Sequence, residues 1–323
     1  MKVLVIGGAG YIGSHMVKTL VERGHAVVVF DSLVTGHRDA VHPAAEFVFG
    51  DLADRARLDR LLARGFDGVM HFASFIQVGE SVARPAKYYR NNLCNSLNLL
   101  DALAAAGGGR LIFSSTAAIF GNPLCTPIDE THPCAPINPY GRTKWMVEQA
   151  LADYGETCGI ASICLRYFNA AGATPDGSLG ERHDPETHLI PLVLQAAAGK
   201  RPAIEIYGDN YDTPDGTCIR DYVHVDDLCA AHLLALDHLV AGGKSAAFNL
   251  GNGRGFSVRE VIAAAERVTG KTVSHSIAPP RPGDPPRLVA DASRAMSELG
   301  WRPQRAALET IIADAWRWEC RRP

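Results

Sequence analysis

The chain has 323 residues, of which 47% are hydrophobic and 21% are charged, and it carries a net charge of −3. This composition is typical of a globular protein with two domains, or with one large domain and an appendage, and gives no basic footprint for nucleic acid. No apolar run approaches the roughly 20 residues that span a bilayer, and the apolar start breaks at glycines, unlike a signal peptide. We therefore expect neither a nucleic acid nor a membrane as partner. The eight cysteines are scattered without a C-x-x-C pair, which predicts free thiols in a reducing cytoplasm.

Strand-like and helix-like segments alternate through the first half of the chain. Apolar strands are predicted at 2–8, 26–31, 45–51, 68–74, 110–116 and 161–169, with helices at 12–23, at 58–64, in one long stretch up to 106, and from about 140. The apolar runs are continuous, which indicates strands that are buried on both faces. Strands separated by helices of this length form parallel βαβ units with right-handed crossovers. We therefore predict an α/β fold, a Rossmann-type doubly wound parallel sheet, over residues 1–169.

The pattern changes after residue 169. A polar, turn-rich loop is predicted at 170–188, then a helix at 189–199, a strand at 203–208 and a second irregular segment at 209–224. Later helices are predicted at 225–240, 257–269 and 306–318, with a strand-like run at 246–252 and an irregular segment at 279–291. These segments predict a smaller C-terminal α/β domain over 170–323 that mainly binds the substrate. Some of its segments are expected to return to the first domain.

A glycine-rich turn follows the first predicted strand. The segment VIGGAGYIGSH satisfies G-x-G-x-x-G through Gly8, Gly10 and Gly13, and equally G-x-x-G-x-x-G starting from Gly7. Glycines let the backbone approach a pyrophosphate, whose charge then lies at the N-terminus of the next helix. Asp31 ends the second strand, where an acid binds the adenosine ribose hydroxyls and repels a 2′-phosphate. The turn in this context predicts NAD rather than NADP as cofactor.

Other strand ends on the same edge are further candidates for the cofactor site. Asp51 and Leu52 are expected beside the adenine, and Phe72 and Ala73 near the pyrophosphate. For Asp51, a helix N-cap is an equal alternative.

A tyrosine stands four residues before a lysine in the segment NPYGRTK. This spacing places Tyr140 and Lys144 on one face of a helix. A free tyrosine has a pKa near 10, which a nearby ammonium, or the positive charge of an oxidised nicotinamide, lowers. Thr116 ends the strand IFSST at the ligand-binding edge, where it can bridge a substrate hydroxyl and Tyr140. We interpret the three residues as an acid–base site, with a surface pair of Tyr140 and Lys144 as the alternative.

Several segments together resemble one enzyme family. They are GGAGYIG, HFAS with VGES, YYRNN, FSSTAAIFG, NPYGRTK, LRYFNAAG, DGTCIRDYVHV and NLGNG. The chain resembles the extended short-chain dehydrogenases/reductases, and within them the UDP-glucose 4-epimerases, over residues 1–318. GGAGYIG and NPYGRTK mark only the superfamily, whereas LRYFNAAG and DGTCIRDYVHV are specific to the epimerase branch.

The resemblance implies roles residue by residue. Tyr140 is implied as the catalytic base and acid, with Lys144 supporting it and Thr116 relaying the proton. The implied NAD site comprises Tyr140 and Lys144 together with Gly7, Gly10, Tyr11, Ile12, Gly13, Asp31, Ser32, Asp51, Leu52, Phe72, Ala73, Asn92 and Phe168. The implied UDP-sugar site comprises Thr116 and Tyr140 together with Asn169, His188, Leu189, Tyr207, Arg220, Arg281, Asp284 and Leu288.

The two implied arginines suit a diphosphate, because a guanidinium forms paired, charge-assisted hydrogen bonds to it. For Arg220 the alternative is an ion pair with Asp221. Three other positions depart from the pattern of some relatives. Ile76 stands where some relatives have a lysine. His188 replaces an asparagine, so its hydrogen bonds to the nucleotide are expected to differ. Leu288 stands where some relatives have a tyrosine, which is expected to enlarge the sugar pocket.

The activity implied is reversible inversion at C4, interconverting UDP-glucose and UDP-galactose through a transient 4-keto sugar with tightly bound NAD. Enzyme alternatives are a UDP-N-acetylhexosamine or UDP-pentose 4-epimerase and a UDP-glucuronate decarboxylase. A 4,6-dehydratase is disfavoured, because Ala117 and Ala118 stand where such enzymes carry an acid pair. A non-catalytic NAD-binding regulator is the alternative from another class of protein.

Two histidines in the segment RHDPETH raise the question of a metal. His183 and His188 have no recognised third ligand in this pattern, and two ligands do not make a metal site. We therefore expect solvated loop residues or substrate contacts here, and no metal.

The oligomeric state is predicted from two helical segments. Those at 81–106 and 142–154 carry more apolar surface than one sheet face covers. A symmetric four-helix contact would bury the excess, which predicts a homodimer, and burial against the chain's own sheet is the alternative.

Overall fold

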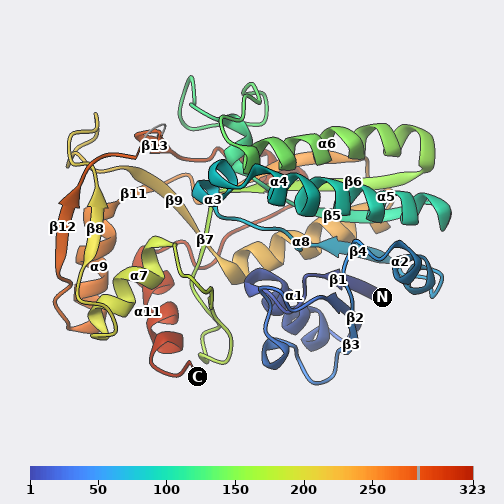
Figure 1. The fold of residues 1–323 in the computed structure, drawn as a ribbon, viewed down its shortest axis with the longest axis horizontal. Coiled ribbons are helices and arrows are strands. Elements are labelled where there is room, and N and C mark those ends of the chain that lie inside the picture. Colours follow the sequence, from blue (N-terminus) through green and yellow to red (C-terminus); the bar gives the residue numbers. More distant parts are fainter. Residues whose placement is uncertain (282–283, 323) are drawn as a thin grey trace.

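A seven-stranded parallel sheet forms the centre of the larger part of the molecule (Figure 1). The computed structural model describes residues 1–281 and 284–322. Neighbouring strands all run parallel, and the order reverses between the first and fourth strands of the chain, the switch point where such sheets bind ligands. In spatial order the strands are β10 (Ala246–Leu250), β6 (Ile160–Tyr167), β5 (Gly109–Thr116), β4 (Gly68–His71), β1 (Lys2–Ile6), β2 (Ala26–Asp31) and β3 (Glu46–Phe49). The predicted fold class is confirmed.

Helices cover both faces of this sheet, which is why its strands read as continuous apolar runs. Within β1, Val3 and Val5 belong to one buried cluster, whereas Leu4 and Ile6 belong to another on the opposite face. The first cluster is covered by two helices, α1 (Tyr11–Glu22) and α8 (Val225–Val240). The second is covered by α2 (Arg55–Leu62), α5 (Asn95–Ala105) and α6 (Pro139–Cys158). Figure 1 shows α5 and α6 side by side.

The single long helix predicted up to residue 106 is wrong. The chain forms α3 (Val78–Ala83), α4 (Pro85–Tyr88) and a π-helical turn (Tyr89–Cys94) before α5 begins. Pro85 starts a new helix because it has no N–H for the preceding one, and Arg84 leaves the helical region at φ −133°. The π turn carries Asn92 toward the loop that follows β4.

The smaller part of the molecule holds short strands and three packed helices. In one sheet, β9 (Ile219–His224) pairs with β7 (Asn169–Ala171), β11 (Gly255–Ser257) and β13 (Arg287–Leu288). In a second sheet, β8 (Ile204–Tyr207) pairs with β12 (His275–Ala278). Its helices are α7 (Leu189–Ala197), α9 (Val258–Thr269) and α11 (Leu308–Glu319). Ser257 starts α9 with a capping box to Glu260, which satisfies backbone donors at that end.

Some segments beyond residue 169 lie in the larger part. Helix α8 packs against α1, β5 and β6, and β10 pairs with β6 at the edge of the large sheet. The short helix α10 (Ser293–Glu298) lies against β10. Across residues 1–281 and 284–322, no helix combines the length and the apolar character needed to cross a membrane.

Candidate active site

The glycine turn after β1 closes tightly against its surroundings. Gly7 has a φ of +80°, and a Cβ on it would lie 2.6 Å from the backbone nitrogen of Ala73. A Cβ on Gly13 would lie 2.1 Å from the Gly7 carbonyl oxygen. The turn therefore brings α1, β1 and the end of β4 together at the switch point of the sheet. This close approach of bare backbone fits a dinucleotide pyrophosphate at the start of α1.

Asp31 lies beside this turn at the end of β2. One of its carboxylate oxygens accepts a hydrogen bond from Ala9 N at 2.9 Å, and the other accepts one from Leu33 N at 2.8 Å. Ser32 between them is half-buried, and Leu33 has a φ of 56°, which is uncommon for a residue with a side chain. A carboxylate has about four acceptor positions, so Asp31 retains capacity for ribose hydroxyls.

Replacing Gly13 with alanine is expected to abolish cofactor binding and to destabilise the fold. The added methyl group meets backbone at 2.1 Å, and backbone cannot move aside as a flexible side chain would. Gly79→Ala is the matched control, because Gly79 is exposed in a helix with nothing within 4 Å of a Cβ. Thermal melts and NAD titrations check this prediction, and equal behaviour of the two variants would contradict it.

Several residues predicted for the cofactor site fulfil structural roles as well. The side-chain amide of Asn92 accepts from Phe75 N and donates to Phe75 O, both at 2.9 Å, which fixes the loop after Phe72 and Ala73. The phenol of Tyr11 donates to Gly172 O at 2.7 Å and ties α1 to the smaller part. The half-buried Ile12 packs against the core on the α1 side of the sheet, and Leu52 is buried on the opposite side.

The N-cap alternative for Asp51 is wrong. Asp54 caps α2 by accepting a hydrogen bond from Arg57 N at 3.0 Å. Asp51 is exposed at the strand-end edge and accepts from Ala53 N at 2.8 Å. Its carboxylate is therefore accessible to a ligand.

The structure brings Thr116, Tyr140 and Lys144 together at the carboxyl edge of β5. Asn138 caps α6 by accepting from Gly141 N at 2.8 Å, which starts the helix directly before Tyr140. One turn later, Lys144 Nζ donates to Ser74 Oγ at 2.7 Å and to Ser114 O at 2.8 Å. The ammonium is thus anchored between the ends of β4 and β5.

The electrostatics of this pair differ from the expectation. Burial raises the pKa of Tyr140, and the nearby Thr116 hydroxyl opposes this shift. Burial also lowers the pKa of Lys144 to about 7, against the opposing charge of Glu148. The other predicted source of a lower Tyr140 pKa is the positive charge of an oxidised nicotinamide.

A buried ion pair lies next to Lys144 on α6, and it was not predicted from the sequence. Arg166 on β6 donates from Nη2 to Glu148 Oε2 at 2.6 Å, and only 7% and 4% of the two side chains are exposed. Ser115 also donates to this carboxylate. Glu148 continues the four-residue spacing of Tyr140 and Lys144 along α6, and that series was the available signal.

Arg220, implied for the UDP-sugar, lies on β9, which pairs with β13. Arg220 forms its ion pair with Asp284 rather than with Asp221. The alternative of an Arg220–Asp221 pair is therefore wrong. Asp221 is buried and accepts from the backbone of Asn252, Gly253 and Ala290 instead.

Arg281 and Leu288 are two further residues implied for the UDP-sugar. The guanidinium of Arg281 lies 3.8 Å from the centre of the Tyr207 ring. Leu288 stands opposite Arg220 in the β9–β13 pair and packs against a buried cluster that also contacts Phe168. This cluster consists of Ala117, Ile119, Phe120 and Ile128, and begins directly after Thr116. Leu288 therefore links Arg220 to the segment that follows Thr116.

Comparison with known proteins agrees with this geometry. The model of the NAD dependent epimerase/dehydratase family matches residues 3–251. The chain belongs to this family. It is 51% identical to a UDP-glucose 4-epimerase of Streptococcus mutans serotype c, over 100% of this chain and 98% of the relative.

Solved structures extend the similarity to the whole fold. A UDP-glucose 4-epimerase from Brucella ovis in complex with NAD is 51% identical, with a TM-score of 0.95 over 98% of this chain and 97% of that one. The UDP-Glc/GlcNAc 4-epimerase from Campylobacter jejuni is 45% identical, with a TM-score of 0.86 over 99% of each chain. The resemblance found in the sequence is confirmed, and so is NAD as the cofactor of this epimerase/dehydratase family member.

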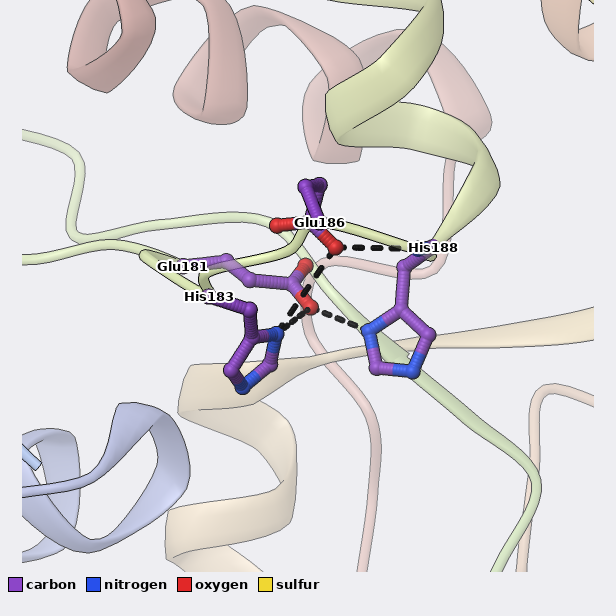
Figure 2. Close-up of side chains that lie close together, drawn as sticks. All are labelled: Glu181, His183, Glu186 and His188. Carbon is purple, nitrogen blue, oxygen red and sulfur yellow. Dashed lines mark hydrogen bonds and ion pairs between the residues drawn. The ribbon is translucent and has the colours of Figure 1, made fainter. Parts of the chain in front are cut away.

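The loop between β7 and α7 departs from the sequence expectation. His188, predicted to contact the substrate, directs Nδ1 at Glu181, and Leu189 starts α7 beside it. Glu181 and Glu186 both lie next to His183 and His188 (Figure 2). The premise that the histidines have no further ligand nearby is therefore wrong.

Proposed function

We propose that this chain interconverts UDP-glucose and UDP-galactose by inverting the configuration at C4 of the sugar. The observation that carries the proposal is the convergence of Thr116, Tyr140 and Lys144 beside the glycine turn. The relatives named UDP-glucose 4-epimerase, which match over nearly the full chain, support it.

In this proposal, Tyr140 takes the proton of the sugar 4-hydroxyl through Thr116 and later returns it. NAD, when bound, supplies the acceptor and donor of the C4 hydride. Lys144 holds its position at the ends of β4 and β5, where it can reach a ribose hydroxyl. The transient 4-keto sugar turns its other face to the same site before reduction. Inversion therefore requires a sugar pocket with few directional contacts.

The nucleotide must stay anchored while the sugar turns. Arg220 and Arg281 are the proposed diphosphate ligands, because each presents a planar guanidinium, Arg220 on β9 and Arg281 beside Tyr207 at the end of β8. In the protein alone, Asp284 neutralises Arg220 and the Tyr207 ring covers Arg281. Both arginines would exchange these partners for phosphate oxygens.

The alternatives are less well supported by the residues present. Elimination of water by a 4,6-dehydratase needs an additional acid–base pair, whereas Ala117 and Ala118 follow Thr116. A UDP-glucuronate decarboxylase would need more basic groups around the sugar carboxylate, and a non-catalytic regulator would not need the catalytic trio.

The test is to incubate the purified protein with UDP-galactose without added NAD and to look for UDP-glucose by NMR. We expect the same final mixture from either sugar, because the proposed cofactor is tightly bound and regenerated in each turnover. Tyr140→Phe protein prepared in parallel is the blank. No conversion even with added NAD, or loss of water or carbon dioxide, would reject the proposal.

We further predict that UDP-N-acetylglucosamine and its C4 epimer are interconverted as well. Leu288 lies between Arg220 and the cluster after Thr116, and leucine leaves more room there than tyrosine does. One misfitting group in a pocket is worth only about 1–3 kcal/mol, so the expected selectivity is modest. The measurement compares kcat/KM for plain and acetylated UDP-sugars in the wild type and in Leu288→Tyr. A wild type that ignores the acetylated pair, or a tyrosine variant that accepts it equally well, would show that Leu288 does not control the pocket.

A homodimer through α5 and α6 is the proposed assembly. Leu100 and Leu151 are buried within the chain's own core, but Met146 is 39% exposed and Leu93, Leu97 and Trp145 are only partly buried. A symmetric contact would cover these side chains. Light scattering at low concentration is expected to give about twice 34.7 kDa, whereas a mass near 34.7 kDa would contradict the dimer.

A cytoplasmic location is part of the same proposal. All eight cysteines are free thiols, which suits a reducing compartment.

A further inference from the structure

Four side chains of the loop between β7 and α7 converge on one point, as Figure 2 shows. Glu181, His183, Glu186 and His188 each offer one nitrogen or oxygen atom, and these atoms all lie within 4.8 Å of one another. The residues follow the pattern E-x-H-x-x-E-x-H within one short segment. We propose that this cluster binds one divalent transition-metal ion of the zinc class. The proposal does not rest on the epimerase reaction.

The spacing of the candidate ligand atoms is close to that of a tetrahedral site. Both ring Nδ1 atoms face Glu181 Oε1, with His183 at 3.1 Å and His188 in closer contact. His183 Nδ1 also lies 3.7 Å from Glu186 Oε1. Zinc bonds of about 2.0–2.2 Å hold four tetrahedral ligand atoms roughly 3.4 Å apart. Small movements of these side chains would therefore suffice to enclose an ion.

Two polar atoms of the cluster lack a partner within the part of the chain that the structure describes. They are Glu186 Oε2 and His183 Nδ1, of which the latter lies 3.1 Å from Glu181 Oε1 without forming a hydrogen bond of good geometry. The side chains of Glu181 and Glu186 are each only 5% exposed, so water cannot fully replace the missing partners. Buried polar groups without partners are costly, and each such group requires an explanation. A cation bound between Glu181 Oε1 and the two rings would give His183 Nδ1 a partner.

The charge of the cluster also favours a cation. Two carboxylates face two imidazoles, which leaves a net charge of −2 when the rings are neutral. The competing occupants are protons, which would convert the four groups into a self-neutral set of ions. A metal ion and protons exclude each other, because a ligating nitrogen must be deprotonated.

The ligand types determine the class of metal and its role. Imidazole nitrogen with carboxylate oxygen suits Zn²⁺ and related transition metals, whereas Mg²⁺ and Ca²⁺ prefer oxygen alone. Four protein ligands leave no open position, which indicates a structural site. The carbonyl of Glu181 accepts from Trp318 Nε1 on α11 at 2.9 Å, and that of Arg182 from His37 Nε2 at 3.0 Å. The ion would therefore stabilise a loop that joins both parts of the molecule.

The experiment measures metal binding without relying on activity. Full-length protein is stripped with a chelator, incubated with ZnCl₂, desalted and analysed for zinc by mass spectrometry, and its Tm is measured with ZnCl₂ or MgCl₂. The ligand variants are His183→Gln and Glu186→Gln. The matched control is His275→Gln, which changes an exposed histidine outside the cluster.

We expect one zinc per chain in the wild type and in the control, and at least about 10-fold weaker binding in each ligand variant. Zinc at 100 times its Kd should raise the wild-type Tm by about 5 °C, whereas magnesium should not. No retained zinc in the wild type, or equal retention in His183→Gln, overturns the proposal. Should the ligand variants fail to fold, Co²⁺ titration of the wild type decides: strong visible bands of a four-coordinate ion support the site, and their absence overturns it.

Discussion

Replacing Tyr140 with phenylalanine is expected to lower turnover at least ~100-fold, the scale of a positioned acid–base group. The change removes one oxygen from the same helix as the anchored Lys144, and this oxygen lies near the Thr116 hydroxyl. The ring itself remains, so the fold and NAD binding should persist. Steady-state kinetics with UDP-galactose, together with a melt and an NAD titration, check all three expectations.

Tyr154→Phe is the matched control for that variant. Tyr154 lies on the same helix, but its phenol bonds to Asp101 at the exposed end. We expect near wild-type turnover from it. Near-normal activity of Tyr140→Phe would mean that another group moves the proton.

Replacing Arg166 with methionine should cost about 3–5 kcal/mol of the free energy of unfolding, because it leaves the Glu148 carboxylate buried without its counter-charge. Ser115 would remain as a donor to that carboxylate, but a neutral hydroxyl does not compensate a buried charge. Urea denaturation followed by circular dichroism measures the loss.

Two comparisons make this result specific. The double variant Glu148→Leu/Arg166→Met should recover part of the loss, because no isolated charge remains. Arg267→Met breaks a pair with Glu309 whose side chains are 60% and 54% exposed, and should cost no more than about 1 kcal/mol. Equal losses in Arg166→Met and Arg267→Met would mean that burial of the Glu148 pair contributes nothing.

The architecture was predictable because the information for it is local and periodic. Continuous apolar runs separated by helices specify a parallel sheet with both faces covered. The break of the long helix at Pro85 was missed, because apolar residues keep their helical spacing on both sides of the proline. The helix nevertheless ends there, since proline has no backbone N–H to continue it. Residues 246–250 were correctly expected to form a strand, but their pairing with β6 depends on contacts distant in sequence.

In the candidate site, too, only the residues whose positions are fixed by local geometry could be predicted from the sequence. Tyr140 and Lys144 could be placed together because helix geometry fixes their separation, and a strand end fixed Thr116. The Arg220–Asp284 pair joins different elements, so no local spacing reveals it. The four-residue series along α6 indicates Glu148, but not its partner Arg166 on another element. Glu181 and Glu186 were overlooked beside His183, because an irregular loop has no period that indicates which side chains converge.

Transfer of a label from UDP-[4-²H]galactose tests the central claim most directly. The proposed chemistry removes and returns the same hydride within one site, while Tyr140 moves only the hydroxyl proton. We predict UDP-glucose that retains the deuterium at C4 and gains none from the solvent. Loss of the deuterium to water, or its appearance at another carbon, would contradict inversion through a 4-keto sugar.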